Sequence, residues 1–203
     1  MAIVHSPLSR AAETAAAIGR AIRAADDPPP AIPIRPDDRF AEIGQGDWEG
    51  RLASEIAQSD GERLAAWRQR PTETWAPGGE RLADVRTRVT DGLEDVLVAL
   101  AAAGRPGTLM APQVSGCHEA PATHPWSIVV GHDGVFKVAL LALFDLPLER
   151  FWMWSSELCG ISVVEVRAGR PVVRAMNLTE HLAPLLDEAA QEESEERSRS
   201  GAL

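Results

Sequence analysis

The sequence predicts an α/β fold in which helices pack against a mostly parallel sheet. Apolar residues 2–4 predict a strand that runs straight into a helix, and the apolar run before "GHDG" predicts a second strand followed by a helix. A run without polar alternation is typical of a strand covered on both faces, as in parallel sheets. Residues 82–100 repeat apolar side chains at spacings of three and four, which predicts a long helix with one face on the sheet. Alternating strands and helices of this kind indicate an α/β layered fold.

The first half of the chain is predicted to contain a helix, a short strand and a glycine-rich loop. A proline-rich connection after the helix holds a short strand around 32–34. The loop "FAEIGQGDWEG" then leads into two short helical stretches, around 51–59 and 61–70. The apolar stripe of the opening helix consists of Leu8, Ala11, Ala15, Ile18 and Ile22.

The second half is predicted to contain the long helix, the second strand with its helix, and a hairpin. A Gly- and Pro-rich segment over 104–125 predicts an irregular loop. The stretch "VFKVALLALF" predicts a buried helix, and residues 160–177 predict two strands that turn at Ala168 and Gly169. The stripe of the long helix consists of Leu82, Val85, Val89, Leu93, Val96 and Leu100.

Composition narrows the classes of protein to which the chain can belong. Its 203 residues, 45% apolar and 25% charged, predict one globular domain over 1–186 and an acidic, disordered tail over 187–203. We expect a cytoplasmic protein with no membrane segment, because the chain has no long uncharged run and no signal-like N-terminus. The two cysteines, Cys117 and Cys159, are expected to be free thiols. A net charge of −10 argues against nucleic acid as a partner.

The first strand-to-helix turn, "VHSPLSRA", has the features of an anion site. Ligands of parallel sheets collect where strands end and helices begin. Ser6 is a candidate helix N-cap and Pro7 suits the first helical position. Arg10 would then lie near the positive end of the helix, where its guanidinium matches the oxygens of a phosphate. The alternative is an ordinary surface arginine.

The second such turn, "VVGHDG", and the glycine-rich loop supply two further candidates. His132 could donate to a phosphate or act as acid or base, with Asp133 capping the next helix. The alternative is a histidine held by backbone groups at the strand end. Glu42 could protonate a leaving oxygen, because the negative charge of a nearby phosphate favours the protonated carboxyl. The alternative for Glu42 is a solvent-exposed loop acid.

Five stretches resemble, in order and spacing, the motifs of the histidine phosphatase superfamily, also called the phosphoglycerate-mutase-like family. They are "SPLSRAAETA", "AEIGQGDWEG", "APGGE", "GHDGVFKVALLALFDLP" and "AMNLTEHL", and they extend to the acidic tail. The resemblance implies a three-layer α/β/α sandwich and a phosphohistidine mechanism that needs no metal or other cofactor. It also implies that Arg10 binds the phosphoryl group, that His132 contacts it, and that Glu42 is the candidate general acid.

One motif of that family is absent from the sequence. The family's nucleophile is the histidine of an Arg-His-Gly triplet at the end of its first strand, and none of the 203 residues forms such a triplet. We therefore expect a truncated reading frame that lacks the first central strand and helix, with the strand edges beside the gap left unpaired. His5 is a weaker substitute, because no second arginine accompanies it and a nucleophile must be held in line with phosphorus.

Two other groups of residues are considered as candidate functional sites. Cys117, His118 and His124 suggest zinc, but the remaining ligands would have to come from elsewhere, so we expect no metal. Trp152 and Trp154 are expected to be core or subunit-contact residues, which leaves a homodimer open, and not platforms for stacking bases.

The sequence therefore predicts a phosphomonoester hydrolase that acts on a small phosphorylated metabolite and whose nucleophilic histidine is absent. The stretch between "DWEG" and "APGGE" is short and lacks the longer insertions of true phosphoglycerate mutases, so the family resemblance implies hydrolysis over a mutase. The other alternative is a noncatalytic relative that binds phosphate or a protein partner.

Overall fold

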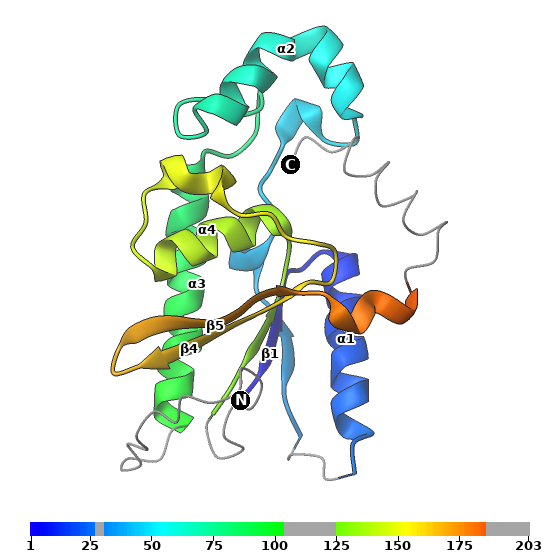
Figure 1. Ribbon diagram of the computed structural model, residues 1–203, viewed down its shortest axis with the longest axis vertical. Coiled ribbons are helices and arrows are strands. Elements are labelled where there is room, and N and C mark those ends of the chain that lie inside the picture. Colours follow the sequence, from blue (N-terminus) through cyan, green and yellow to red (C-terminus); the bar gives the residue numbers. More distant parts are fainter. Residues whose placement is uncertain (27–30, 104–124, 186–203) are drawn as a thin grey trace. The chain divides into compact units, whose positions relative to one another are not determined.

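The computed structural model describes residues 1–26, 31–103 and 125–185 (Figure 1). The predicted tail and the zinc candidates Cys117, His118 and His124 lie outside this part of the chain. The chain divides into two compact units, which are described separately. The first consists of residues 1–42 and 87–135, and the second of residues 43–86 and the chain from 136 onward.

A parallel sheet of three strands forms the centre of the first unit. Its strands are β1 (Ile3–His5), β2 (Ile34–Pro36) and β3 (Ile128–Val130), in the order β2-β1-β3. Val4 of β1 pairs with Arg35 on one side and with Val129 on the other. The predicted mixed α/β fold with a parallel sheet is confirmed.

One expectation about the strands is wrong. We expected β3 to be covered on both faces, but all three of its residues are only half-buried. β3 pairs directly with β1 and lies at the edge of the sheet in the described part of the chain, where β1 is its single neighbour. The expectation that a strand next to β3 is missing stays a prediction.

Helix α1 (Ser9–Arg23) lies along this sheet, next to β1 (Figure 1). It begins later than predicted: Leu8, with an extended backbone, occupies the N-cap position, and no side chain caps the helix. Ser6 is therefore not the N-cap. Arg10 still lies in the first turn, as its second residue. The buried face of α1 consists of Ala11, Ala15 and Gly19.

Helices α3 (Leu82–Ala103) and α4 (Asp133–Leu143) each begin in one unit and continue in the other. The predicted stripe of α3 is buried at Leu82, Val85, Val89 and Val96. The buried face of α4 confirms the predicted buried helix and consists of Val135, Val138, Ala139 and Leu141.

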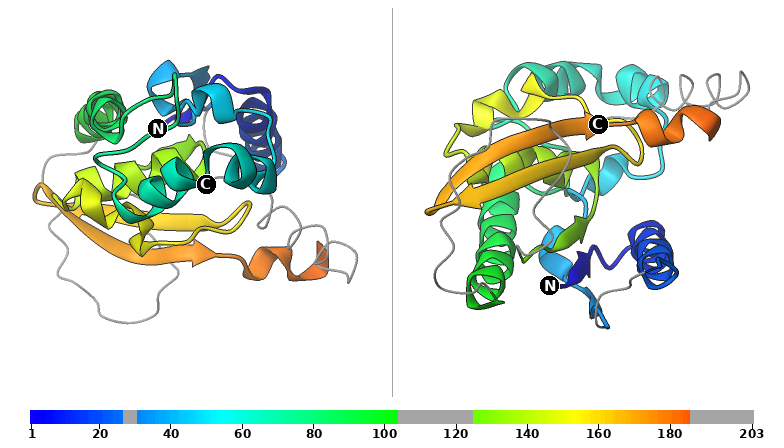
Figure 2. Two further views of the ribbon diagram at one scale, coloured as in Figure 1. Left: turned by 90° about the horizontal axis from the view of Figure 1, so that it is seen from above. Right: turned by 60° about the horizontal axis from the view of Figure 1, so that its bottom comes forward.

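The second unit contains helix α2 (Ala53–Gln69) and the hairpin of β4 (Ile161–Arg167) and β5 (Arg170–Leu178). The two predicted short helices run as one helix bent at Asp60, whose φ of −144° and ψ of 35° are not helical. The hairpin, clear in both views of Figure 2, turns at Ala168 and Gly169 as predicted. Both turn residues have positive φ, 49° and 76°, the conformation that tight hairpin turns need. Short 3-10 turns complete the described elements at Asp38–Phe40, Gly46–Trp48, Leu148–Met153 and Glu180–Leu185.

An aromatic cluster forms the core of the second unit. Trp67 and Phe151 are buried, with ring centroids 5.5 Å apart. Trp152, predicted to be a core or contact residue, lies edge-on to both of them. The ammonium group of buried Lys137 lies 5.1 Å from the centre of the Trp152 ring, within the range of cation–π attraction. Cys159 is an exposed free thiol, as predicted.

None of the described helices has both the length and the apolar character needed to cross a bilayer. In the same part of the chain, His, Cys, Asp and Glu side chains form no group of three or more that could hold a metal ion.

Candidate active site

Arg10 and His132 lie together where β1 and β3 end. Nε of Arg10 donates a hydrogen bond to Nδ1 of His132 at 3.1 Å. The two strands are parallel neighbours, so their carboxyl ends lie at the same edge of the sheet. Arg10 is in the first turn after β1, and His132 directly precedes α4. This contact joins two of the three predicted site residues.

Ser6 completes a cluster of three with Arg10 and His132. Its Oγ lies 2.8 Å from Nε2 of His132. Sequence reasoning assigned Ser6 to helix capping and missed this contact. The one available signal was its position as a small polar residue directly after a strand.

His132 is neutral at physiological pH. Burial of the ring, and next the positive charge of Arg10, lower the pKa of His132 to about 4. Because a guanidinium can only donate hydrogen bonds, Nδ1 of His132 is the acceptor and the ring proton sits on Nε2. His132 therefore adds no second positive charge beside Arg10.

The Arg10 side chain is exposed, and within the described residues His132 is its single hydrogen-bond partner. No described carboxylate pairs with it. Its terminal nitrogens thus keep donors directed away from His132, in the planar arrangement that matches two phosphate oxygens. The geometry suits an anion that arrives from solvent.

Glu42 lies at the start of α4, in the same unit as Arg10 and His132. Its Oε1 accepts a hydrogen bond from the backbone N–H of Val135 at 3.1 Å. Arg88 of α3 holds the backbone around Glu42 by donating to the carbonyls of Arg39 and Ala41 at 2.8 Å and to that of Glu42 at 3.3 Å. All three predicted residues thus have defined hydrogen bonds. The bond from Val135 connects Glu42 to α4, the helix that directly follows His132.

His5, the substitute nucleophile considered above, is a buried residue at the end of β1. Its Nδ1 lies 2.7 Å from the carbonyl oxygen of Ser6. Since the carbonyl can only accept, Nδ1 carries a proton and donates it to this oxygen.

Two further family-like motifs contact each other in the second unit. Oε2 of Glu80, in "APGGE", accepts a hydrogen bond from the backbone N–H of Gly44 at 2.8 Å. Gly46 has a φ of 50°, and a β-carbon there would collide with the carbonyl oxygen of Pro77. The glycines of these motifs therefore allow two loops to pack closely.

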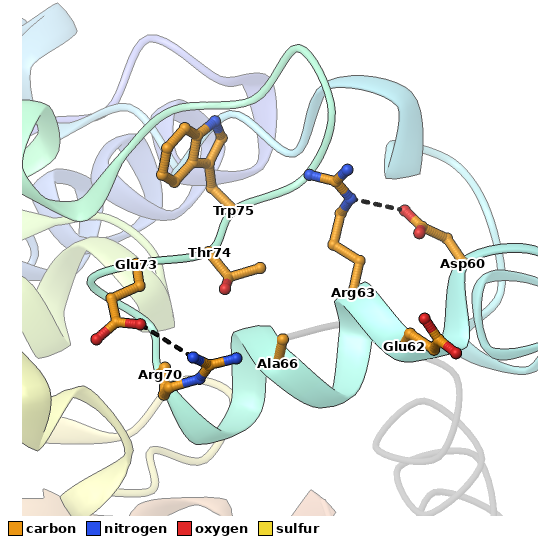
Figure 3. Close-up of a pocket in the computed structure, with 8 residues that line it drawn as sticks. All are labelled: Asp60, Glu62, Arg63, Ala66, Arg70, Glu73, Thr74 and Trp75. Atoms are coloured by element: carbon orange, nitrogen blue, oxygen red, sulfur yellow. Dashed lines mark hydrogen bonds and ion pairs between the residues drawn. The ribbon is translucent and has the colours of Figure 1, made fainter.

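A separate hollow of about 520 Å³ lies on α2 and the loop that follows it (Figure 3). Its two arginines are paired with neighbouring acids, Arg63 with Asp60 at 3.4 Å and Arg70 with Glu73 at 3.2 Å. None of the predicted site residues lines it. The other lining residues are Glu62, Ala66, Thr74 and Trp75.

Comparison with known proteins decides the family. The sequence profile of the histidine phosphatase superfamily (branch 1) matches residues 1–105 and 106–179. The chain belongs to this superfamily. By family it is therefore a phosphatase, as the five motifs predicted.

Relatives named as phosphatases cover most of the chain. Phosphoserine phosphatase 1 of Hydrogenobacter thermophilus is 27% identical to this chain, and the match covers 92% of this chain and 74% of the length of that enzyme. Glucosyl-3-phosphoglycerate phosphatase of Mycobacterium tuberculosis is 33% identical over 72% of this chain, which spans about half of that enzyme (55%). The solved structure of Bacillus stearothermophilus YhfR has a TM-score of 0.66, with 27% identity over 89% of this chain and 75% of its own.

The depressed pKa of His132 predicts a pH-dependent stability. Between its ordinary pKa of 6.5 and about 4, the unfolded chain binds a proton that the folded ring does not. The free energy of unfolding should therefore fall by up to about 3 kcal/mol as pH falls through this window, with no contribution from His132 above it. Urea unfolding at pH 7.5, 6 and 4.5 measures the slope. A His132→Asn variant should lose the part of the pH dependence of the unfolding free energy that comes from His132. Identical pH dependences in both proteins would contradict the lowered pKa of His132.

Proposed function

We propose that the cluster of Arg10, His132 and Ser6 is the phosphoryl-binding part of a phosphomonoester hydrolase. The observation that carries the proposal is the contact between Arg10 and His132. It leaves an exposed guanidinium, with no acidic partner among the described residues, where two parallel strands end. Such strand ends are where α/β folds bind ligands.

The chemistry proposed for this site assigns one role to each residue. The terminal N–H groups of Arg10 bind two phosphoryl oxygens and stabilise their negative charge. Neutral His132 holds the guanidinium from the other side. Glu42 gives its proton to the leaving oxygen as the bond from phosphorus to that oxygen breaks. In the family mechanism the phosphoryl group passes to a histidine nitrogen, from which water releases inorganic phosphate.

The relatives support a small phosphorylated metabolite as the substrate. Phosphoserine and glucosyl-3-phosphoglycerate, named in the two curated relatives, are both small phosphomonoesters that carry a carboxylate. We propose that the site of this chain binds a substrate of the same class, with a cytoplasmic location and no metal.

A second candidate function is noncatalytic phosphate binding. It is favoured by one observation, the absence of an Arg-His-Gly triplet from the 203 residues. An in-frame triplet in the DNA before Met1 would exclude this candidate and favour the hydrolase.

The test is turnover of 4-nitrophenyl phosphate by the 203-residue chain, followed as released nitrophenolate. We expect no measurable turnover, because the sequence holds no nucleophile triplet. Turnover that is lost in His5→Ala would overturn this expectation. Turnover that survives in His5→Ala but not in His132→Ala would mean that the phosphohistidine role has to be reassigned within the site.

A further inference from the structure

Ser6 is held rigidly between the two strand-to-helix turns. The residue is fully buried. Its backbone N–H donates to the carbonyl of Val130 at 2.8 Å, which ties it to the strand leading to His132. Its Oγ lies 3.3 Å from the backbone N–H of Leu8, the residue before α1. The hydroxyl therefore has a fixed position relative to both turns.

The direction of the hydrogen bonds defines what Ser6 can do. Arg10 occupies the acceptor Nδ1 of His132, so Nε2–H donates to Oγ of Ser6 at 2.8 Å. In this tautomer Nε2 has no lone pair and cannot take the hydroxyl proton. Ser6 is therefore not a nucleophile activated by His132, although the pair resembles one in distance.

We propose that Ser6 is a positioning residue that holds the His132 ring as the Nε2–H tautomer, so that Nδ1 in turn orients the Arg10 guanidinium for an anion. The orienting of Arg10 toward phosphate rests on the function proposed above. Without the hydroxyl, the buried Nε2–H loses its acceptor, and an unmet buried donor is costly. The Nδ1–H form, which has no buried donor at Nε2, then becomes more favourable relative to the Nε2–H form, and in it Nδ1–H opposes the N–H of Arg10 and turns the exposed guanidinium away.

The tautomer can be measured directly by ¹⁵N NMR of the histidine rings at pH 7.5, with His132→Asn used to assign the signals. In the unaltered chain we expect Nε2 of His132 to be protonated and Nδ1 unprotonated. Ser6→Ala should shift the signals toward the Nδ1–H form, whereas Ser9→Ala, at the exposed first residue of α1, should not. Ser6→Cys fills the site with a somewhat larger thiol that accepts hydrogen bonds only weakly. It should also shift the ring signals, and it replaces Ser6→Ala if that variant does not fold.

Calorimetric titration with inorganic phosphate measures the consequence for Arg10. Ser6→Ala should bind phosphate about tenfold more weakly than the unaltered chain and Ser9→Ala. An unprotonated Nε2 in the unaltered chain, or unchanged ring signals in the Ser6 variants, would overturn the inference while phosphate binding stands. Shifted signals with unchanged affinity would overturn the link to Arg10. Failure of the unaltered chain to bind phosphate would overturn the proposed function, and the ring signals would still decide whether Ser6 sets the tautomer.

Discussion

Replacement of Arg10 with alanine should weaken binding of inorganic phosphate by about a hundredfold, because it removes the charged, planar donor proposed to bind the phosphoryl oxygens. Arg10→Lys keeps the charge but not the paired donors, so a loss of roughly tenfold is expected. Isothermal titration calorimetry measures both affinities.

The matched control for Arg10 is Arg20→Ala, on the exposed surface of the same helix. Its phosphate affinity should equal that of the unaltered chain. If Arg10→Ala and Arg20→Ala bound phosphate equally well, Arg10 would not be the anion ligand.

The pKa of His132 gives a second measurement on Arg10→Ala. Loss of the Arg10 charge should raise this pKa from about 4 toward its ordinary value.

Arg88→Ala should lower the free energy of unfolding by about 3 kcal/mol, because three backbone carbonyls lose a charged donor. The segment that carries Glu42 would then be released from α3. Arg88→Lys offers a single point charge in place of the guanidinium and should recover only part of the loss. Urea unfolding followed by circular dichroism gives the free energies.

The control for Arg88 is again Arg20→Ala, which should stay within about 0.5 kcal/mol of the unaltered protein, as ordinary surface substitutions do. An Arg88→Ala variant equally close to the unaltered protein would show that the three carbonyl contacts do not hold the Glu42 segment.

The elements with regular patterns were predictable from the sequence. The apolar repeat of α3 and the turn at Ala168 and Gly169 appear where local periodicity and turn chemistry predict them. The bend of α2 at Asp60 lies at the break between its two predicted halves. Strand pairing was less predictable, because the direct pairing of β1 with β3 depends on a contact between residues far apart in the chain.

The site was predictable in its residue types but not in its hydrogen bonds. Arg10 and His132 were both expected at strand-to-helix turns, and these turns meet because β1 and β3 are neighbours. The preference of serine for helix ends predicted that Ser6 caps α1. Its hydroxyl contacts His132 instead, a residue far away in the sequence, and local sequence cannot show this contact. The support of Glu42 by Arg88 likewise depends on the packing of α3 and leaves no local signal.

The most direct test of the phosphate site is a crystal structure of the 203-residue chain grown with inorganic phosphate. We expect the anion within hydrogen-bond distance of the terminal nitrogens of Arg10, with His132 still bonded to Ser6. A phosphate bound instead by Arg63 and Arg70 in the hollow on α2, with none at Arg10, would contradict the proposed site.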